Sequence, residues 1–291
     1  MHIENRKILI TGVTGTLGGR VASKMKNEGA EVIVLIRNQS LAQKFRDEGF
    51  VPLIGDLTDS TYLCKIMKGV DYVINCAAYL GEDTELAIAS NIMGVKFLAH
   101  AALDNSVKKF IHISTTSVYG EPQSGHLDED SPLAYDHPET YISTKIRSEQ
   151  ILSTYNDKGL PVIVLRSGAI CAETNSYWGD NQVKRMLSCD NVTWVHPDDS
   201  VPWVHADNLA EMIYIALLHG IDGEVYHAID LNVDDRNFRV QLAIAAKKKI
   251  ITPNRQVENA TYTFDKIREI GYRPLKTFEQ TMNNLIKLVP R

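Results

Sequence analysis

A tyrosine and a lysine stand four residues apart, at Tyr141 and Lys145, in a segment whose pattern predicts a helix. Residues four apart share one face of a helix, so these side chains are expected to lie side by side. A phenol with a pKa near 10 is a poor base at neutral pH, and a neighbouring ammonium group lowers that pKa. The pair therefore suits proton exchange with a substrate, although at this spacing alone it is more often an exposed helix pair.

A second reactive group is predicted at the end of an apolar strand, where the chain reads Ser-Thr-Thr-Ser from Ser114 to Ser117. A hydroxyl at this position can orient and polarise a substrate carbonyl. We assign this role to Thr115, and note that Ser114 and Thr116 are neighbours with the same chemistry. A catalytic set of Thr115, Tyr141 and Lys145 follows.

A glycine-rich turn follows the first apolar strand, with Gly12, Gly15 and Gly18 spaced three apart before a predicted helix. In this context, Gly12 permits the tight turn, Gly15 lets the backbone approach a pyrophosphate, and Gly18 lets helix and strand pack closely. The turn predicts a dinucleotide site, in which Thr16 and Leu17 also contact the cofactor. The alternative is an ordinary strand-helix turn.

The end of the second strand discriminates between nicotinamide cofactors. NAD-binding proteins usually place an acid there to bond the ribose hydroxyls, whereas this chain has Leu35-Ile36-Arg37-Asn38. Arg37 can pair with a 2′-phosphate, so NADP is favoured over NAD. The alternative is that Arg37 is a solvated loop residue.

Later strand ends supply the remaining cofactor contacts. We expect these at Asp56, Leu57, Ala77, Ala78 and Ser167, and also at Tyr141 and Lys145 beside the nicotinamide ribose. Asp56 suits the adenine amino group or a helix N-cap, although Thr58 and Asp59 are the better-placed caps.

The elements that must position these residues alternate between strand and helix. Continuous apolar runs, typical of strands buried on both faces, occupy 7–11, 31–37, 51–54, 72–76, 109–114 and 162–166. Helical patterns occupy 17–28, 60–67, 84–103 and 140–155. This order predicts an α/β fold with a doubly wound parallel Rossmann sheet over residues 1–166. Residues 167–291 are expected to form mostly a smaller C-terminal substrate-binding lobe, with about 203–230 packing back on the sheet.

Composition limits the classes of function. The chain has 291 residues, 44% of them hydrophobic, and a formal net charge of −5. We find no basic block for nucleic acid or a membrane surface, no signal segment and no apolar run near the ~18 residues of a membrane span. Four cysteines lack metal-type spacing. We therefore expect no metal and a cytoplasmic protein with reduced thiols.

These segments together resemble the short-chain dehydrogenase/reductase superfamily, in particular its extended, epimerase/dehydratase-like branch. The resemblance covers most of the chain, including Asn91-Ile92-Met93-Gly94, Val118-Tyr119-Gly120, Leu165-Arg166-Ser167-Gly168, Trp203 to Asn208 and Ile270 to Pro274. It implies catalytic roles for Thr115, Tyr141 and Lys145, and a homodimer formed through helices 84–103 and 140–155. His205 and Asp207 match a structural segment of the family, so an N-cap is expected there rather than catalysis.

Departures from the family bear on the substrate. Sugar 4,6-dehydratases follow the catalytic threonine with Asp-Glu, whereas Thr116-Ser117 stand here. Nucleotide-sugar enzymes usually carry an arginine before the residue matching Trp203, where this chain has Val201-Pro202, and no late Arg-Pro-Gly-Asp-like phosphate motif is visible. Tyr177, Trp178, Trp194 and His196 either line an apolar pocket or form the core of a small lobe.

The leading hypothesis is an NADP-dependent oxidoreductase that reduces a carbonyl, or oxidises the alcohol, of a small metabolite. The first alternative is a nucleotide-sugar epimerase with tightly bound NAD. The second is a non-catalytic dinucleotide sensor, which ranks last because sensors of this fold commonly lose the tyrosine or the lysine.

Overall fold

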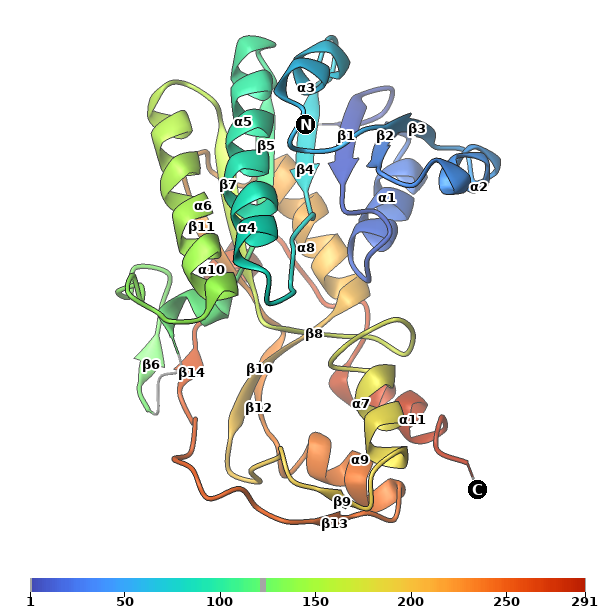
Figure 1. Cartoon of the computed structure of the whole chain (residues 1–291), viewed down its shortest axis with the longest axis vertical. Coiled ribbons are helices and arrows are strands. Elements are labelled where there is room, and N and C mark those ends of the chain that lie inside the picture. The colour runs from blue at the N-terminus through green and yellow to red at the C-terminus, as the bar shows by residue number, and fades with distance from the viewer. Residues whose placement is uncertain (1, 121–123, 291) are drawn as a thin grey trace.

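A seven-stranded parallel sheet forms the centre of the molecule in the computed structural model, which describes residues 2–120 and 124–290 (Figure 1). Its strand order is β11-β7-β5-β4-β1-β2-β3, and every neighbouring pair is parallel. The strands are β1 (Lys7–Thr11), β2 (Glu31–Ile36), β3 (Val51–Ile54), β4 (Tyr72–Asn75), β5 (Lys109–Thr115), β7 (Val162–Ser167) and β11 (Val225–Ala228). The predicted α/β fold with a doubly wound parallel sheet is confirmed.

The six strands predicted from apolar runs all form, each within one residue of its predicted ends. β5 and β7 are buried along their whole length, as expected for central strands covered on both faces. β3 lies at the edge of the sheet and contains Pro52, which lacks a backbone N–H and is tolerated at an edge.

Helices cover both faces of the sheet. On one face α1 (Gly18–Asn27) packs against α8 (Ala206–His219), and both bury apolar side chains on the strands. On the other face lie α3 (Ser60–Ile66), α5 (Val95–Asp104) and α6 (Thr140–Asp157). Shorter helices connect these layers: Gln39–Leu41, α2 (Ala42–Asp47), Thr116–Tyr119 and α10 (Asp265–Glu269).

The helix predicted over 84–103 consists of α4 (Thr84–Ala87), a π-helical segment (Ile88–Gly94) and α5. Thr84–Asp104 is long and apolar enough to cross a membrane, with a mean hydropathy of 1.5, which corrects the expectation that no segment reaches this length. In the structure 44% of this window is buried, and α5 packs between α3 and α6 as a core helix does.

The remaining elements form a smaller lobe beyond the carboxyl ends of the sheet strands, in the lower half of Figure 1. It contains three small sheets: β8 (Ala169–Cys171), β10 (Ser200–His205) and β12 (Leu231–Asp234); β9 (Asn191–Val192) with β13 (Lys249–Ile250); and β6 (His126–Leu127) with β14 (Thr261–Tyr262). Its helices are α7 (Asp180–Leu187), α9 (Arg239–Ala245) and α11 (Phe278–Ile286). Trp203 and Phe238 lie in its apolar core.

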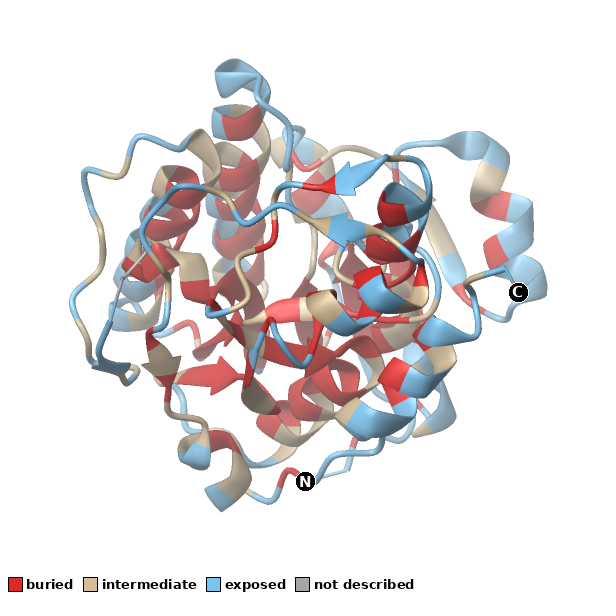
Figure 2. Ribbon diagram, turned by 90° about the horizontal axis from the view of Figure 1, so that it is seen from below, coloured by how far each residue is buried: buried red, intermediate tan, exposed pale blue. Residues whose placement is uncertain are grey.

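The chain returns from this lobe to the sheet. β10 leads directly into α8, and β11 then pairs with β7 as the last strand of the sheet. Figure 2 shows buried residues concentrated in the strands and inner helix faces, while outer loops are exposed. The strand order reverses between β1 and β4, and parallel α/β sheets bind ligands at such a switch point.

Candidate active site

A cavity of about 730 Å³ lies at this switch point. It runs along the loops that follow β1 to β5 and meets the N-terminal part of α6. Every residue predicted for catalysis or cofactor contact lines it: Gly12, Gly15, Thr16, Leu17, Gly18, Arg37, Asp56, Leu57, Ala77, Ala78, Thr115, Tyr141, Lys145 and Ser167. Segments as far apart as β1 and β7 thus contribute to one site.

The glycine-rich turn is shaped for close backbone approach. Gly12 has a positive φ of 72°, and a Cβ there would lie 2.6 Å from the Ala77 nitrogen. A Cβ on Gly18 would lie 2.3 Å from the Gly12 oxygen, so these two positions require glycine. Gly15 faces open space apart from the Gly12 oxygen at 3.4 Å, and no side chain caps the N-terminus of α1. This open, uncapped helix N-terminus fits a pyrophosphate.

The loop after β2 forms the far end of the cavity. Arg37 is exposed and lines the cavity, and among the described residues its guanidinium has no hydrogen-bond or ion-pair partner. Asp56, after β3, accepts hydrogen bonds from the backbone nitrogen and hydroxyl of Thr58, at 2.9 and 2.8 Å. Asp59 caps α3 through the Tyr62 nitrogen, as its better position predicted. Asp56 therefore remains beside the cavity rather than at the helix cap.

Thr115, Tyr141 and Lys145 line the same cavity as Arg37. The hydroxyl of Thr115 accepts a hydrogen bond from the Ser117 nitrogen at 3.1 Å and interacts with the Tyr141 hydroxyl. Ser114 points instead to the buried Glu149 carboxylate. Thr115 is therefore distinguished from Ser114 by the partner that its hydroxyl faces.

Burial dominates the protonation of both titratable groups. Burial raises the pKa of Tyr141 to about 12, opposed by the hydrogen bond with Thr115. Burial lowers the pKa of Lys145 to about 8, opposed by the charge of Glu149. Burial outweighs any lowering of the Tyr141 pKa by Lys145, whose ammonium donates to the Ile113 carbonyl at 2.6 Å. The lowering expected from an ammonium together with a nicotinium cation stays a prediction.

A buried chain of hydrogen bonds joins the glycine-rich turn to α6. The Thr11 hydroxyl donates to the Asn75 side-chain oxygen at 2.6 Å, and the Asn75 amide lies 3.1 Å from His112 Nδ1. His112 Nε2 lies 3.2 Å from the Ser148 hydroxyl, which donates to the Lys145 carbonyl at 2.7 Å. Burial holds the pKa of His112 well below its usual value, so the ring is neutral. All of these hydrogen bonds are satisfied when the His112 ring carries its hydrogen on Nε2 and accepts at Nδ1.

These hydrogen bonds, and the roles of His112 and Ser148 in them, were not predicted from the sequence. Their only signal was a polar residue inside an apolar strand, and Ser148 lying three residues after Lys145. This series of hydrogen bonds connects β1 to α6 and so holds α6, which carries Lys145, in position.

A buried ion pair also supports α6. Arg166 Nη2 donates to the Glu149 carboxylate at 2.8 Å, and Arg166 Nη1 donates to the Tyr119 hydroxyl at 2.6 Å. Tyr119 in turn lies 2.6 Å from His227 Nε2 on β11. Burial raises the pKa of Tyr119, whereas the bonds to Glu149 raise that of Arg166 against the effect of burial. The pair keeps opposite charges together beneath the catalytic residues.

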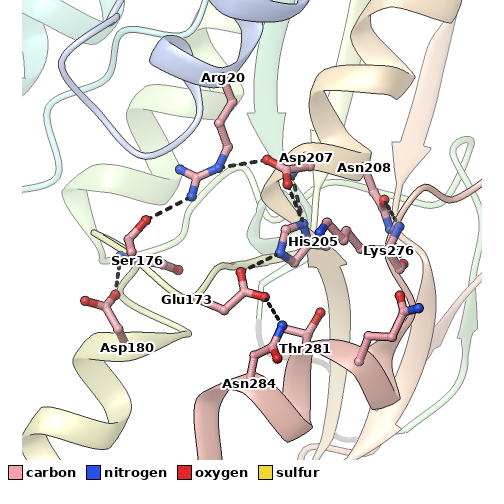
Figure 3. Close-up of polar contacts among 12 residues, drawn as sticks. Arg20, Glu173, Ser176, Asp180, His205, Asp207, Asn208, Lys276, Thr281 and Asn284 are labelled. Carbon is pink, nitrogen blue, oxygen red and sulfur yellow. Dashed lines mark hydrogen bonds and ion pairs between the residues drawn. The ribbon is translucent and has the colours of Figure 1, made fainter. Parts of the chain in front are cut away.

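The loop after β8 closes over the glycine-rich turn and is fixed by polar contacts (Figure 3). Arg20 on α1 pairs with Asp207 at 3.0 Å, and His205 Nε2 lies 3.1 Å from Glu173. His205 Nδ1 accepts from the Asp207 nitrogen and caps α8, which confirms the predicted N-cap. This network holds in place the loop that carries Trp178 into the cavity.

A smaller cavity of about 280 Å³, here called the side pocket, adjoins the first. The two share Thr115, Ser117, Gly168 and Trp178 as lining residues. The side pocket also contains charged residues of the smaller lobe: Asp199, Arg239 and Glu258. Trp194 does not line either cavity; it stacks under Arg185 at 3.7 Å and packs on the lobe core. Among the described residues no three His, Cys, Asp or Glu side chains are grouped to hold a metal ion.

Comparison with known families identifies the fold and the kind of site. A family model described as NAD dependent epimerase/dehydratase family matches residues 8–231. The chain belongs to this family. The resemblance to the extended short-chain dehydrogenase/reductases is thereby confirmed.

Similar proteins of stated activity include a ketoreductase, 4,6-dehydratases and a UDP-glucose 4-epimerase. A 4-hydroxy-2-methyl-3-oxo-4-farnesyl-3,4-dihydroquinoline-1-oxide ketoreductase from Stigmatella aurantiaca is 28% identical, over 77% of this chain and 68% of its own length. A dTDP-glucose 4,6-dehydratase from Streptomyces antibioticus is 27% identical, over 94% of this chain and 89% of its own. The chain thus belongs to an enzyme family of oxidoreductases and epimerases.

Solved structures share the fold. A dTDP-glucose 4,6-dehydratase from Streptomyces venezuelae with NAD and TYD bound aligns with a TM-score of 0.82 at 24% identity, covering 97% of this chain and 96% of that one. A UDP-glucose 4-epimerase from Thermotoga maritima with UDP-glucose aligns at 0.81 with 21% identity, covering 97% of each. At these identities the likeness shows the fold alone.

Proposed function

We propose that this protein is an NADP-dependent oxidoreductase that reduces the carbonyl of a small metabolite, or oxidises the corresponding alcohol. The observation that carries the proposal is that Thr115, Tyr141 and Lys145 line the same cavity as Arg37. The ketoreductase relative supports a reductase, and Thr116-Ser117 after the catalytic threonine argue against dehydration.

The residues of the cavity fit a dinucleotide. Gly15 and the N-terminus of α1 would hold the pyrophosphate, and Arg37 would pair with a 2′-phosphate. Asp56 would accept from the adenine, and Lys145 would bond the nicotinamide ribose. Leu57, Ala77, Ala78 and Ser167 would line the remaining length. The bound nicotinamide supplies or accepts the hydride.

Tyr141 moves the proton. Because burial raises its pKa to about 12, the phenol is protonated at neutral pH and suited to donate to a developing alkoxide. Thr115 orients the substrate oxygen through its hydroxyl. Below pH 8 the Lys145 ammonium stabilises the phenolate that forms as the proton leaves.

Turnover with a carbonyl panel tests the proposal. Purified protein is mixed with NADPH and aldehydes or ketones of graded size, and loss of absorbance at the nicotinamide band is followed. We expect reduction of at least one carbonyl, with NADPH preferred to NADH. Absence of turnover with both cofactors would contradict the proposal.

A nucleotide-sugar epimerase with tightly bound NAD is the second candidate. Solved relatives carry NAD, and one epimerase carries UDP-glucose, which favours this alternative. Interconversion of UDP-glucose and UDP-galactose without added cofactor would select it. A non-catalytic sensor would instead show cofactor-dependent capture of a partner and no turnover.

Assembly and location remain predictions. Leu86 and Ile88 are exposed apolar residues of the helix proposed for the homodimer interface. Light scattering at micromolar concentration is expected to give twice the chain mass of 32.6 kDa, and a monomer mass would contradict this. We propose a cytoplasmic location because all four cysteines are free thiols.

A further inference from the structure

The side pocket lies where a substrate must sit if the proposed function holds. It shares Thr115 with the cofactor cavity, and Trp178 stands between the two. A molecule bound in the side pocket would therefore present a group to the Thr115 hydroxyl, next to Tyr141. The charges and size of this pocket then decide which carbonyl compounds reach the catalytic residues.

The cationic group that lines the pocket is already paired. Arg239 donates through Nε to Asp235 at 2.7 Å and through Nη2 to the second oxygen of the same carboxylate. Asp235 is fully buried and faces Arg239 in this bidentate arrangement. The guanidinium carbon also lies 4.9 Å from the Trp178 ring. Little of the Arg239 charge is left to bind an anionic ligand.

The second guanidinium near the pocket is shared by two acids. Arg255 binds Asp199 with both of its terminal nitrogens, and Nη1 lies 3.0 Å from Glu258. Asp199 and Glu258 line the pocket, whereas Arg255 does not. Asp199 is almost fully buried and its charge is matched by Arg255, so Glu258 is the acid of this group whose charge is in excess.

Glu139 adds a further negative charge at the rim. It is exposed, lines the pocket and is the N-cap residue of α6, where the partial positive charge of the helix end favours a carboxylate. Glu139, Asp199, Asp235 and Glu258 therefore outnumber the guanidinium groups of Arg239 and Arg255 by two charges. An anionic substrate group would meet repulsion on entering.

The pocket is also small. Its 280 Å³ is less than half of the 730 Å³ of the cavity proposed to hold a whole dinucleotide. A nucleoside diphosphate sugar approaches a dinucleotide in size and carries two phosphates. Phosphate groups are bound in proteins by arginine, lysine or helix N-termini, and both arginines here are engaged by carboxylates.

We infer that the side pocket selects a small carbonyl substrate that is uncharged or cationic and carries no phosphate or carboxylate group. This inference rests on the proposed function, since it names the substrate class of the same site. Glu139 and Glu258 are the specificity-determining residues, because Asp235 and Asp199 are each matched by one guanidinium group and these two acids set the net sign of the charge around the pocket.

A pair of aldehydes that differ only in charge provides the test. 4-Formylbenzamide is neutral and 4-formylbenzoate is an anion of the same size. With NADPH in excess, kcat/KM for the amide is expected to exceed that for the carboxylate by about tenfold or more. Equal values would overturn the inference while leaving the proposed function intact.

Variants that remove one negative charge show which residue causes the preference for the neutral aldehyde. Glu258→Gln removes one pocket charge and is expected to narrow the amide-to-carboxylate ratio about threefold by raising kcat/KM for the carboxylate. Glu269→Gln makes the same change on an exposed residue that does not line the pocket, and is expected to leave the ratio unchanged. An unchanged ratio in Glu258→Gln, or an equal change in both variants, would overturn the assignment.

Titration calorimetry distinguishes failure of this substrate inference from failure of the proposed function. UDP, dTDP and both aldehydes are titrated into protein loaded with NADP. The inference expects no saturable binding of either nucleotide below millimolar concentration, and tighter binding of the amide than of the carboxylate. Submillimolar nucleotide binding, or failure of the amide to bind, would overturn the inference. Amide binding without any turnover would leave the pocket assignment standing and contradict the proposed function.

Discussion

The cofactor cavity and the side pocket share Thr115 and Trp178, yet their charges are opposite. Two cations, Arg37 and Lys145, and one acid, Asp56, line the cavity, together with an uncapped helix N-terminus. Three acids, Asp199, Glu258 and Glu139, and one cation, Arg239, line the pocket. A ligand with phosphates is favoured on one side of Thr115 and disfavoured on the other. The difference explains how one continuous site can hold a phosphorylated cofactor beside an unphosphorylated substrate.

The two regions also differ in construction. The cavity consists largely of loops that each follow one strand of the sheet, so its residues occur in short motifs. The pocket combines the end of β5, the start of α6 and separate segments of the smaller lobe.

The largest effect is expected at the junction of the two regions. Tyr141→Phe removes the proton donor but keeps the ring, so kcat should fall by about 10³-fold, within the range for general acid-base catalysis. The dissociation constant of NADPH, measured by fluorescence titration, should change less than about threefold because the ribose and phosphate contacts are retained. Retained turnover would remove Tyr141 from the catalytic set.

The buried pair beneath both regions is expected to control stability. Arg166→Met leaves the Glu149 carboxylate buried without its partner, which should lower the free energy of unfolding by about 3–5 kcal/mol. Urea unfolding followed by circular dichroism measures this change. Lys7→Met removes one partner of an exposed pair with Glu31 and serves as the control, with an expected change below about 1 kcal/mol. Similar values for the two variants would contradict a supporting role for Arg166.

Arg37, at the far end of the cavity, is expected to determine the preference for NADPH over NADH. Arg37→Ala should raise the dissociation constant of NADPH about tenfold to a hundredfold, because a charge-assisted contact with the 2′-phosphate is lost. The constant for NADH should stay unchanged, since NADH lacks that phosphate. An equal increase in the dissociation constants of both cofactors would show that Arg37 acts through structure rather than charge.

A smaller and graded effect is expected from pH. Burial lowers the pKa of Lys145 to about 8, so the ammonium is present below pH 8 and lost above it. Carbonyl reduction should therefore be steady from pH 6 to 8 and fall about tenfold for each unit above that. Tyr141, with a pKa of about 12, stays protonated throughout. A rate that stays level to pH 10 would contradict the role given to Lys145.

Sequence patterns predicted the sheet well because each strand buried on both faces must be a continuous apolar run. The cavity residues were also predictable, since a glycine turn, a strand end and a Tyr-Lys helix pair are local signals. Asp199, Arg239 and Glu258 lie in three segments of the smaller lobe and form no motif, so only the fold brings them together. The burial that raises the pKa of Tyr141 and the bond from the Lys145 ammonium to Ile113 could not be predicted, because helix spacing reveals neither.

Identification of the dinucleotide that the protein carries would test the central claim most directly. Purified protein is denatured, and the released small molecules are quantified by mass spectrometry. We predict an empty site or traces of NADP, because an oxidoreductase exchanges its cofactor in each cycle. Stoichiometric NAD would contradict the proposed function, and would favour an epimerase that keeps its cofactor through the reaction.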